Sequence, residues 1–168
     1  MTDDYIQQTA ALLKQFEPGF LPYPVFEQVA RLVALPIVEF IPLRKTDTGI
    51  EVLLIARPHD DVLWPDLLHT PGTVVRATDF GTEATVWPPF SRIIHDELLD
   101  TELGQPQYVG SLLNKSKRGV EQAQIYWVEV LGDPKVGTFY PVTNLPSTLM
   151  DSQKTFIAEA VRHFSHNS

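Results

Sequence analysis

The stretch from Trp64 to Gly104 constrains the fold more than any other feature of the sequence. Trp64 precedes a Pro71-Gly72 turn, and a short β-branched segment, Thr73 to Val75, follows directly. A polar loop then leads into a segment whose apolar residues recur at helical spacing and whose acidic residues gather before Gly104, a glycine suited to end a helix. This order predicts a domain with both helices and strands. Acidic residues clustered on one side of a helix are unusual for packing alone, so we expect this helix to carry the chemistry.

The rest of the chain predicts helices at both ends and hairpins between them. Apolar residues at helical spacing predict helices over residues 3–16, 24–35 and 149–164. Strands are expected at residues 37–43, 50–56, 108–113 and 124–130, with turns at residues 45–49 and 114–119. Residues 57–70 and 78–89 are expected to be loops, and Pro88 or Pro89 suits the first turn of the acidic helix.

Composition narrows the class of protein. The 168 residues suit one domain with its own core, and the absence of cysteine excludes disulfides, thiolate metal sites and cysteine nucleophiles. The formal net charge of −8 argues against stable binding to nucleic acids or anionic membranes, because that binding depends on clustered lysine and arginine. No signal sequence is expected, and no apolar run approaches the roughly 20 residues of a membrane helix. These features predict a cytoplasmic protein.

Residues 64–104 resemble the sequence motif of the Nudix family. That motif has a glycine after a strand, a loop, and a helix bearing Arg-Glu-hydrophobic-x-Glu-Glu-x-Gly. Trp64 and Pro71-Gly72 resemble the aromatic residue and the Pro-Gly-Gly segment of the family, with Thr73 in place of the second glycine. The interval between Gly72 and Glu97 is some ten residues longer than in the family pattern, about the length of residues 79–88.

The acidic helix aligns with the motif in two registers. In the first, Glu97 takes the first glutamate position, Asp100 the next acidic position and Thr101 the one after it, with Gly104 one residue late. In the second, Gly104 is fixed and Glu102 matches the second glutamate of the pair. Helical geometry favours the first, because residues at i, i+3 and i+4 share a face, whereas five residues span about 500° of rotation.

The resemblance implies a fold, a reaction and a set of site residues. The fold is α+β, a Nudix-like α/β/α sandwich with a mixed β-sheet in residues 36–168, preceded by an N-terminal helical extension in residues 1–35. The activity is Mg²⁺- or Mn²⁺-dependent hydrolysis of a nucleoside diphosphate linked to another moiety, in which carboxylates hold the ion on the diphosphate. The implied catalytic residues are Glu97 and Asp100, the metal ligands Glu97, Asp100 and Glu102, and the substrate-binding residues Trp64 and Gly72. Arg57, which follows a strand outside the motif, is a further candidate for substrate binding.

Other readings of the same residues remain open. Thr101 brings no negative charge and Asp96 cannot make the ion pair of the motif arginine, so a non-catalytic Nudix-like domain that binds a small ligand or a protein is the alternative. A third possibility is an interaction domain whose N-terminal helices carry the function or form a homodimer contact. The acidic residues could be a solvated helix face, and Trp64 could be core. Arg57 and the hairpin-tip residues Lys115, Lys117 and Arg118 could either meet phosphate or form a solvated charge run.

Overall fold

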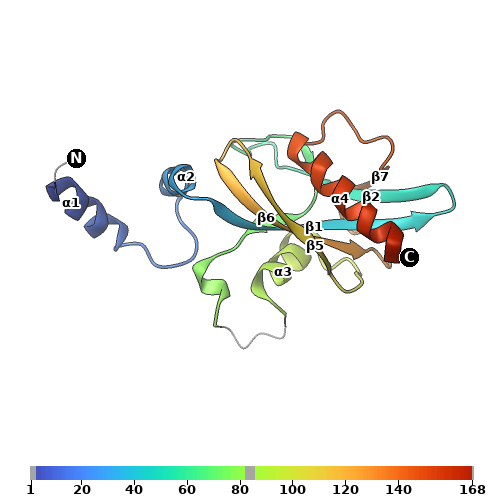
Figure 1. Ribbon diagram of the computed structural model, residues 1–168, viewed down its shortest axis with the longest axis horizontal. Coiled ribbons are helices and arrows are strands. Elements are labelled where there is room, and N and C mark those ends of the chain that lie inside the picture. The colour runs from blue at the N-terminus through green and yellow to red at the C-terminus, as the bar shows by residue number, and fades with distance from the viewer. Residues whose placement is uncertain (1–2, 82–85, 168) are drawn as a thin grey trace.

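The computed structural model describes residues 3–81 and 86–167. Its elements are α1 (Asp3–Leu13), α2 (Tyr23–Leu32), β1 (Leu35–Thr46), β2 (Gly49–Ala56), β3 (Leu68–His69), β4 (Gly72–Val74), the 3₁₀ turn η1 (Ala77–Asp79), α3 (Pro88–Arg92), the π-helical turn η2 (Ile93–Glu97), β5 (Gln107–Lys115), β6 (Val120–Glu129), β7 (Thr138–Pro141) and α4 (Asp151–Asn167). Figure 1 shows their arrangement. No helix in this described part of the chain is both long and apolar enough to cross a membrane.

A single mixed sheet forms the centre of the molecule. Its main strand order is β3-β2-β1-β6-β5, with β4 paired to β1 and β7 paired to β2. The β1–β6 pair is parallel and the remaining pairs are antiparallel. Every residue of β1 from Ile37 to Leu43 is buried, as expected for a central strand covered on both faces. Glu39 is the one charged residue in this buried run.

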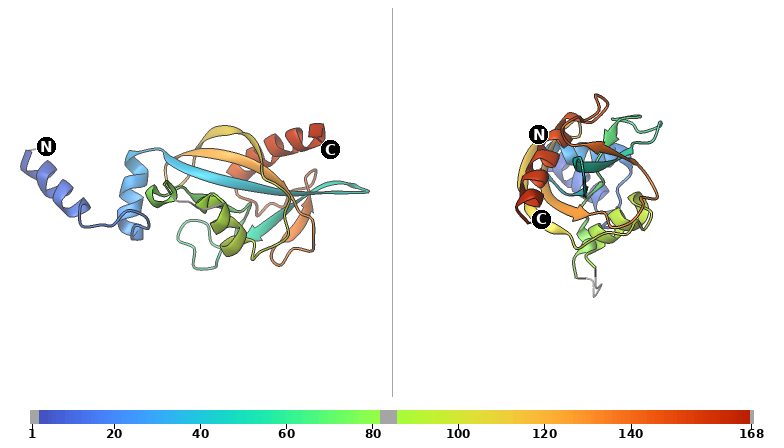
Figure 2. Two further views of the ribbon diagram at one scale, coloured as in Figure 1. Left: turned by 90° about the horizontal axis from the view of Figure 1, so that it is seen from below. Right: turned by 90° about the vertical axis from the view of Figure 1, so that its right-hand side faces the viewer.

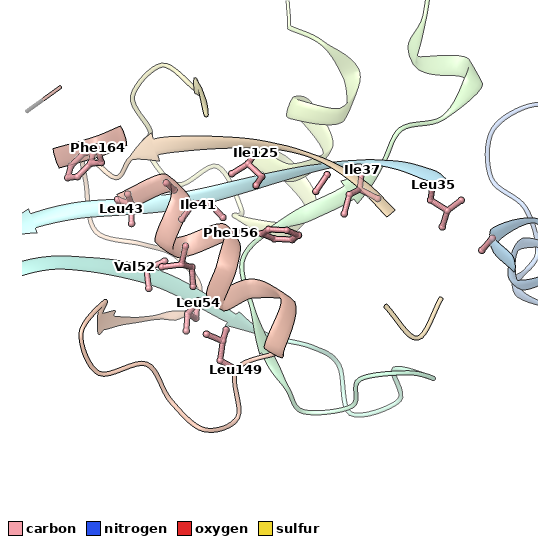
Figure 3. Packing of buried hydrophobic residues seen from close by; sticks show 14 residues of the cluster. Leu35, Ile37, Ile41, Leu43, Val52, Leu54, Ile125, Leu149, Phe156 and Phe164 are labelled. Atoms are coloured by element: carbon pink, nitrogen blue, oxygen red, sulfur yellow. The ribbon is translucent and has the colours of Figure 1, made fainter. Parts of the chain in front are cut away.

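Helices cover both faces of the sheet. On one face, Phe156, Ile157, Ala160 and Phe164 of α4 pack against apolar residues of β1, β2 and β6 (Figure 3). On the other face, Ile93 and Leu98 belong to a second cluster with Val38, Phe40 and Leu53. Figure 2 shows α4 and α3 on opposite sides of the strands. The expected α+β fold with helix, sheet and helix layers is therefore confirmed.

The two helices of the N-terminal extension differ in how they contact the sheet domain. No residue of α1 is buried, and this helix lies away from the sheet (Figure 1). Ala30 of α2 is buried, and a Cβ at Gly119, in the tip of the β5–β6 hairpin, would lie 2.4 Å from the Ala30 carbonyl oxygen. The hairpin tip therefore holds the C-terminal end of α2. The boundary at residues 35 and 36 remains a prediction.

The acidic helix is shorter than the sequence predicts. It was expected to continue to Gly104, but it ends at Glu97, and Leu99 and Asp100 follow with φ values of 51° and 58°. Its last turn is π-helical, and the Leu98 amide donates to the Ile93 carbonyl over 3.0 Å. A five-residue repeat brings Ile93 and Leu98 to the same side, and both are fully buried. Burial of these two side chains thus outweighs continuation of the α-helix.

The short strand β7 was not predicted at all.

Candidate functional site

A cavity of about 470 Å³ lies where the N-terminal extension meets the sheet. Its walls come from the linker and α2, from β1, from the loop 57–64, from β4 and from the tip of the β5–β6 hairpin. Charged side chains of both signs line it: Glu39, Arg57, Asp61, Arg76, Arg118 and Glu121. This mixture of charges makes the cavity the strongest candidate for a ligand site.

Two arginines share one tryptophan ring in the cavity wall. The guanidinium carbon of Arg118 lies 5.0 Å from the centroid of Trp64, and that of Arg57 lies 5.9 Å from it. Arg118 also pairs with Glu121 over 2.7 Å, and Arg57 pairs with Asp61. A guanidinium has five N–H donors, so both groups keep donors beyond these ion pairs.

The loop that carries Trp64 is fixed by Asp61. Its Oδ1 accepts the backbone N–H groups of Leu63 and Trp64 over 3.0 and 2.8 Å, while Oδ2 accepts from Arg57 Nε over 2.9 Å. Lys117 of the hairpin tip also donates to the Leu63 carbonyl over 2.8 Å. An aspartate that accepts from the backbone of following residues is a common way to order a turn. The loop is therefore held both by Asp61 within it and by Lys117 of the hairpin tip.

Glu39 and Glu97 approach each other at Gly72. Glu39 and Gly72 are cross-strand partners, and a Cβ at Gly72 would lie 2.5 Å from Glu39 Oε2. The Gly72 amide donates to Glu97 Oε2 over 3.1 Å. Gly72 therefore leaves room for one carboxyl group and holds the other, which explains the glycine at this position.

Burial controls the charge of this carboxyl pair. It raises the pKa of Glu39 well above its usual range, and the nearby Glu97 carboxylate adds to the rise. Burial also raises the pKa of Glu97 to about 7, although the Gly72 hydrogen bond and Arg57 oppose the change. The ionised form is therefore disfavoured in both groups, strongly in Glu39, whereas Glu97 is protonated in only part of the molecules at neutral pH.

Glu39 belongs to a hydrogen-bonded set that reaches α4. The Thr70 hydroxyl lies 3.2 Å from Glu39 Oε2 and also contacts Gln153 Oε1. The Thr70 amide donates to the same Gln153 oxygen over 3.3 Å. The β1 strand, the segment before β4 and α4 are joined through these side chains.

The predicted site residues fall into two groups. Arg57, Trp64 and Gly72 line the cavity, and Glu97 is joined to it through Gly72. Asp100 lies beyond the end of the helix, is exposed, and pairs with His95. Glu102 is also exposed, beside Gly132. Neither Asp100 nor Glu102 is a cavity residue, so the shared helix face expected for Glu97 and Asp100 is not formed.

Glu39 and Gln153 are among the cavity residues that were not identified from the sequence. Glu39 could have been found as the single charge inside the apolar run 37–43. Burying a carboxyl group costs free energy, so a glutamate in a central strand indicates a specific partner or function. Gln153 carries no such signal, because a glutamine near the start of a helix is common on protein surfaces. Only the packing of α4 on the sheet brings it to Thr70.

The acidic residues of the described chain do not form a cluster of three or more metal ligands. Mg²⁺ is usually held by one or two carboxylates, with waters and substrate phosphates as the other ligands. Within residues 3–81 and 86–167, no group of three or more His, Cys, Asp or Glu side chains could hold an ion. Glu39 and Glu97 offer two carboxyl groups, but one oxygen of each already accepts a hydrogen bond and burial favours their neutral forms.

Solved structures of Nudix proteins share this architecture. The Nudix domain of NrtR from Shewanella oneidensis, in complex with ADP ribose, aligns over 98% of this chain and 99% of its own, with 16% identity and a TM-score of 0.57. A MutT/Nudix family protein from Listeria innocua aligns over 79% of this chain and 95% of its own, with 18% identity and a TM-score of 0.57. The Ap4A hydrolase of C. elegans aligns over 80% and 98%, with 12% identity and a TM-score of 0.54. No protein-family model matches the sequence, and no curated protein does. At these identities the likeness concerns the fold, and the fold of this chain is the Nudix fold.

Proposed function

We propose that this chain is a Nudix-fold domain that binds a nucleoside diphosphate derivative without hydrolysing it. The observation that carries the proposal is the pair of arginines, Arg57 and Arg118, held on Trp64 inside the cavity, while Asp100 and Glu102 lie outside it. Arg57 and Arg118 are therefore placed to bind phosphate within one cavity, whereas the three carboxylates expected to hold the ion are not among its lining residues.

The arginine pair suits a diphosphate. A guanidinium group donates two parallel hydrogen bonds to phosphate oxygens, and the ion pairs with Asp61 and Glu121 restrict both side chains before a ligand arrives. Less conformational entropy is then lost on binding. The bound ADP ribose of the NrtR Nudix domain supports a ligand of this class.

The carboxyl groups argue for binding over metal-dependent hydrolysis. Metal ligands must be ionised, and burial makes ionisation of Glu39 and Glu97 costly, so an ion bound at this pair would have to offset that cost. The helix that supplies the ligands in the sequence motif is interrupted after Glu97. A neutral carboxyl group at Glu39 can instead donate a hydrogen bond to a ligand.

The test combines binding and turnover. Titration calorimetry with ADP ribose should show binding to the wild type and a loss of about ten-fold or more in Arg57→Gln and Arg118→Gln. Arg44→Gln is the matched control, since Arg44 also pairs with a glutamate and lies 3.5 Å from an aromatic centroid, Phe139, but does not line the cavity. Equal losses in all three variants would contradict the proposal.

Cleavage of ADP ribose to AMP and ribose 5-phosphate, with Mg²⁺ or Mn²⁺, is measured on the same proteins by quantifying the AMP formed. No turnover is expected. Metal-dependent turnover that Glu97→Gln abolishes would support the hydrolase implied by the sequence motif and would overturn the proposed function.

A further inference from the structure

The N-terminal extension forms part of the cavity wall. Phe20, Tyr23 and Phe26 line the same cavity as Arg57 and Arg118. Phe26 packs partly on the core, but Phe20 is 79% exposed and Tyr23 is 36% exposed. Exposed aromatic side chains in the wall of a cavity indicate a ligand site better than single ones on a convex surface do, because ligand cavities are lined mainly by apolar and aromatic side chains.

Contacts on both sides hold this wall in place. On one side, the Arg76 guanidinium lies 5.8 Å from the Phe20 centroid, and Thr78 lies next to Gly19. On the other side, the close approach of Gly119 to the Ala30 carbonyl fixes the end of α2. The segment between these contacts carries Tyr23 and Phe26 and is therefore held against the sheet domain, unlike α1.

We propose that Phe20 and Tyr23 bind the heteroaromatic base of the ligand whose phosphates bind Arg57 and Arg118. The inference rests on the proposed function, and it adds that the N-terminal extension selects nucleotides over simple phosphates. A cavity with guanidinium groups and exposed aromatic rings suits a molecule that carries both a diphosphate and a flat ring. Stacking of a base on an aromatic side chain is tolerant of the base, so the wall favours nucleotides as a class.

The experiment compares ADP with inorganic pyrophosphate, which lacks the base. Calorimetry on Phe20→Leu and Tyr23→Leu should show a loss of ADP affinity of about five-fold or more, with pyrophosphate affinity unchanged within about two-fold. Tyr23→Phe, which keeps the ring, should bind ADP like the wild type. Tyr5→Leu is the matched control, since Tyr5 is 65% exposed on the same extension but does not line the cavity.

The outcomes separate this inference from the proposed function. If ADP binds and both leucine variants keep wild-type affinity, the aromatic wall is wrong and the arginine site stands. A loss in Tyr5→Leu equal to that in Tyr23→Leu also overturns the aromatic wall, because the effect then comes from the extension as a whole. If neither ADP nor pyrophosphate binds the wild type, the proposed function fails, and the inference fails with it.

Discussion

Replacing Glu97 by glutamine is expected to make the stability of the fold less dependent on pH. Burial raises the pKa of this carboxyl group from 4.5 to about 7 in the folded state. The folded protein therefore binds more protons than the unfolded chain between these values, and its stability falls as the pH rises through that window. The cost is absent below a pH of 4.5 and fully present above about 7. Glutamine keeps the size of the side chain and an oxygen that can accept the Gly72 amide, but it never ionises.

The size of the effect follows from the same values. A rise from 4.5 to about 7 corresponds to roughly 3 kcal/mol, at about 1.4 kcal/mol for each pH unit. Glu97 is only partly buried, and solvent screening lowers this figure, so we expect Glu97→Gln to be about 1–2 kcal/mol more stable than wild type at about pH 8. At about pH 5 most of that difference should disappear.

Urea unfolding at the two pH values measures the change. Glu102→Gln is the control, since Glu102 is exposed and should show no pH-dependent difference from wild type. A Glu97→Gln variant whose stability relative to wild type is the same at both pH values would refute the reasoning, because burial would then not be what disfavours the ionised carboxylate.

Two further substitutions test the packing around the site. Gly72→Ala should lower the free energy of unfolding by about 1–3 kcal/mol in urea denaturation, since the new methyl group would lie 2.5 Å from Glu39 Oε2. Gly110→Ala is the control, because nothing lies within 4 Å of a Cβ there, and it should change the free energy of unfolding much less. Equal losses in the two variants would contradict the predicted clash with Glu39. Asp79→Asn should cost about 2–4 kcal/mol in the same assay, because the largely buried Arg92 would lose the charge that pairs with it over 2.5 Å; a neutral result would show that solvent reaches this ion pair.

Regular elements were predictable where one local rule was sufficient. The Asp47-Thr48-Gly49 turn and the flanking β-rich runs predicted the β1–β2 hairpin, and apolar spacing predicted α4. The end of the acidic helix was not predictable from spacing, because α-helical and π-helical turns differ in which residues they bring to one side. Burial of Leu98 determines where the helix ends. This burial depends on the sheet face opposite α4, which supplies Val38, Phe40 and Leu53.

The candidate site was predictable only in part for a related reason. Trp64 and Gly72 were identified through the motif, Arg57 as a charged residue after a strand, and all three line the cavity. Arg118 was left between phosphate contact and solvent, and its place on Trp64 depends on how the hairpin tip folds back over the loop 57–64. Glu39 and Gln153 meet through Thr70 from segments far apart in the chain, so no local pattern links them.

The π-helical turn determines both what the helix buries and which acidic residues belong to it. Its five-residue repeat places Ile93 and Leu98 in the same buried cluster. The chain leaves the helix directly afterwards, at Leu99 and Asp100. Asp96 and Glu97 therefore belong to the helix, whereas Asp100 and Glu102 belong to the loop that follows it.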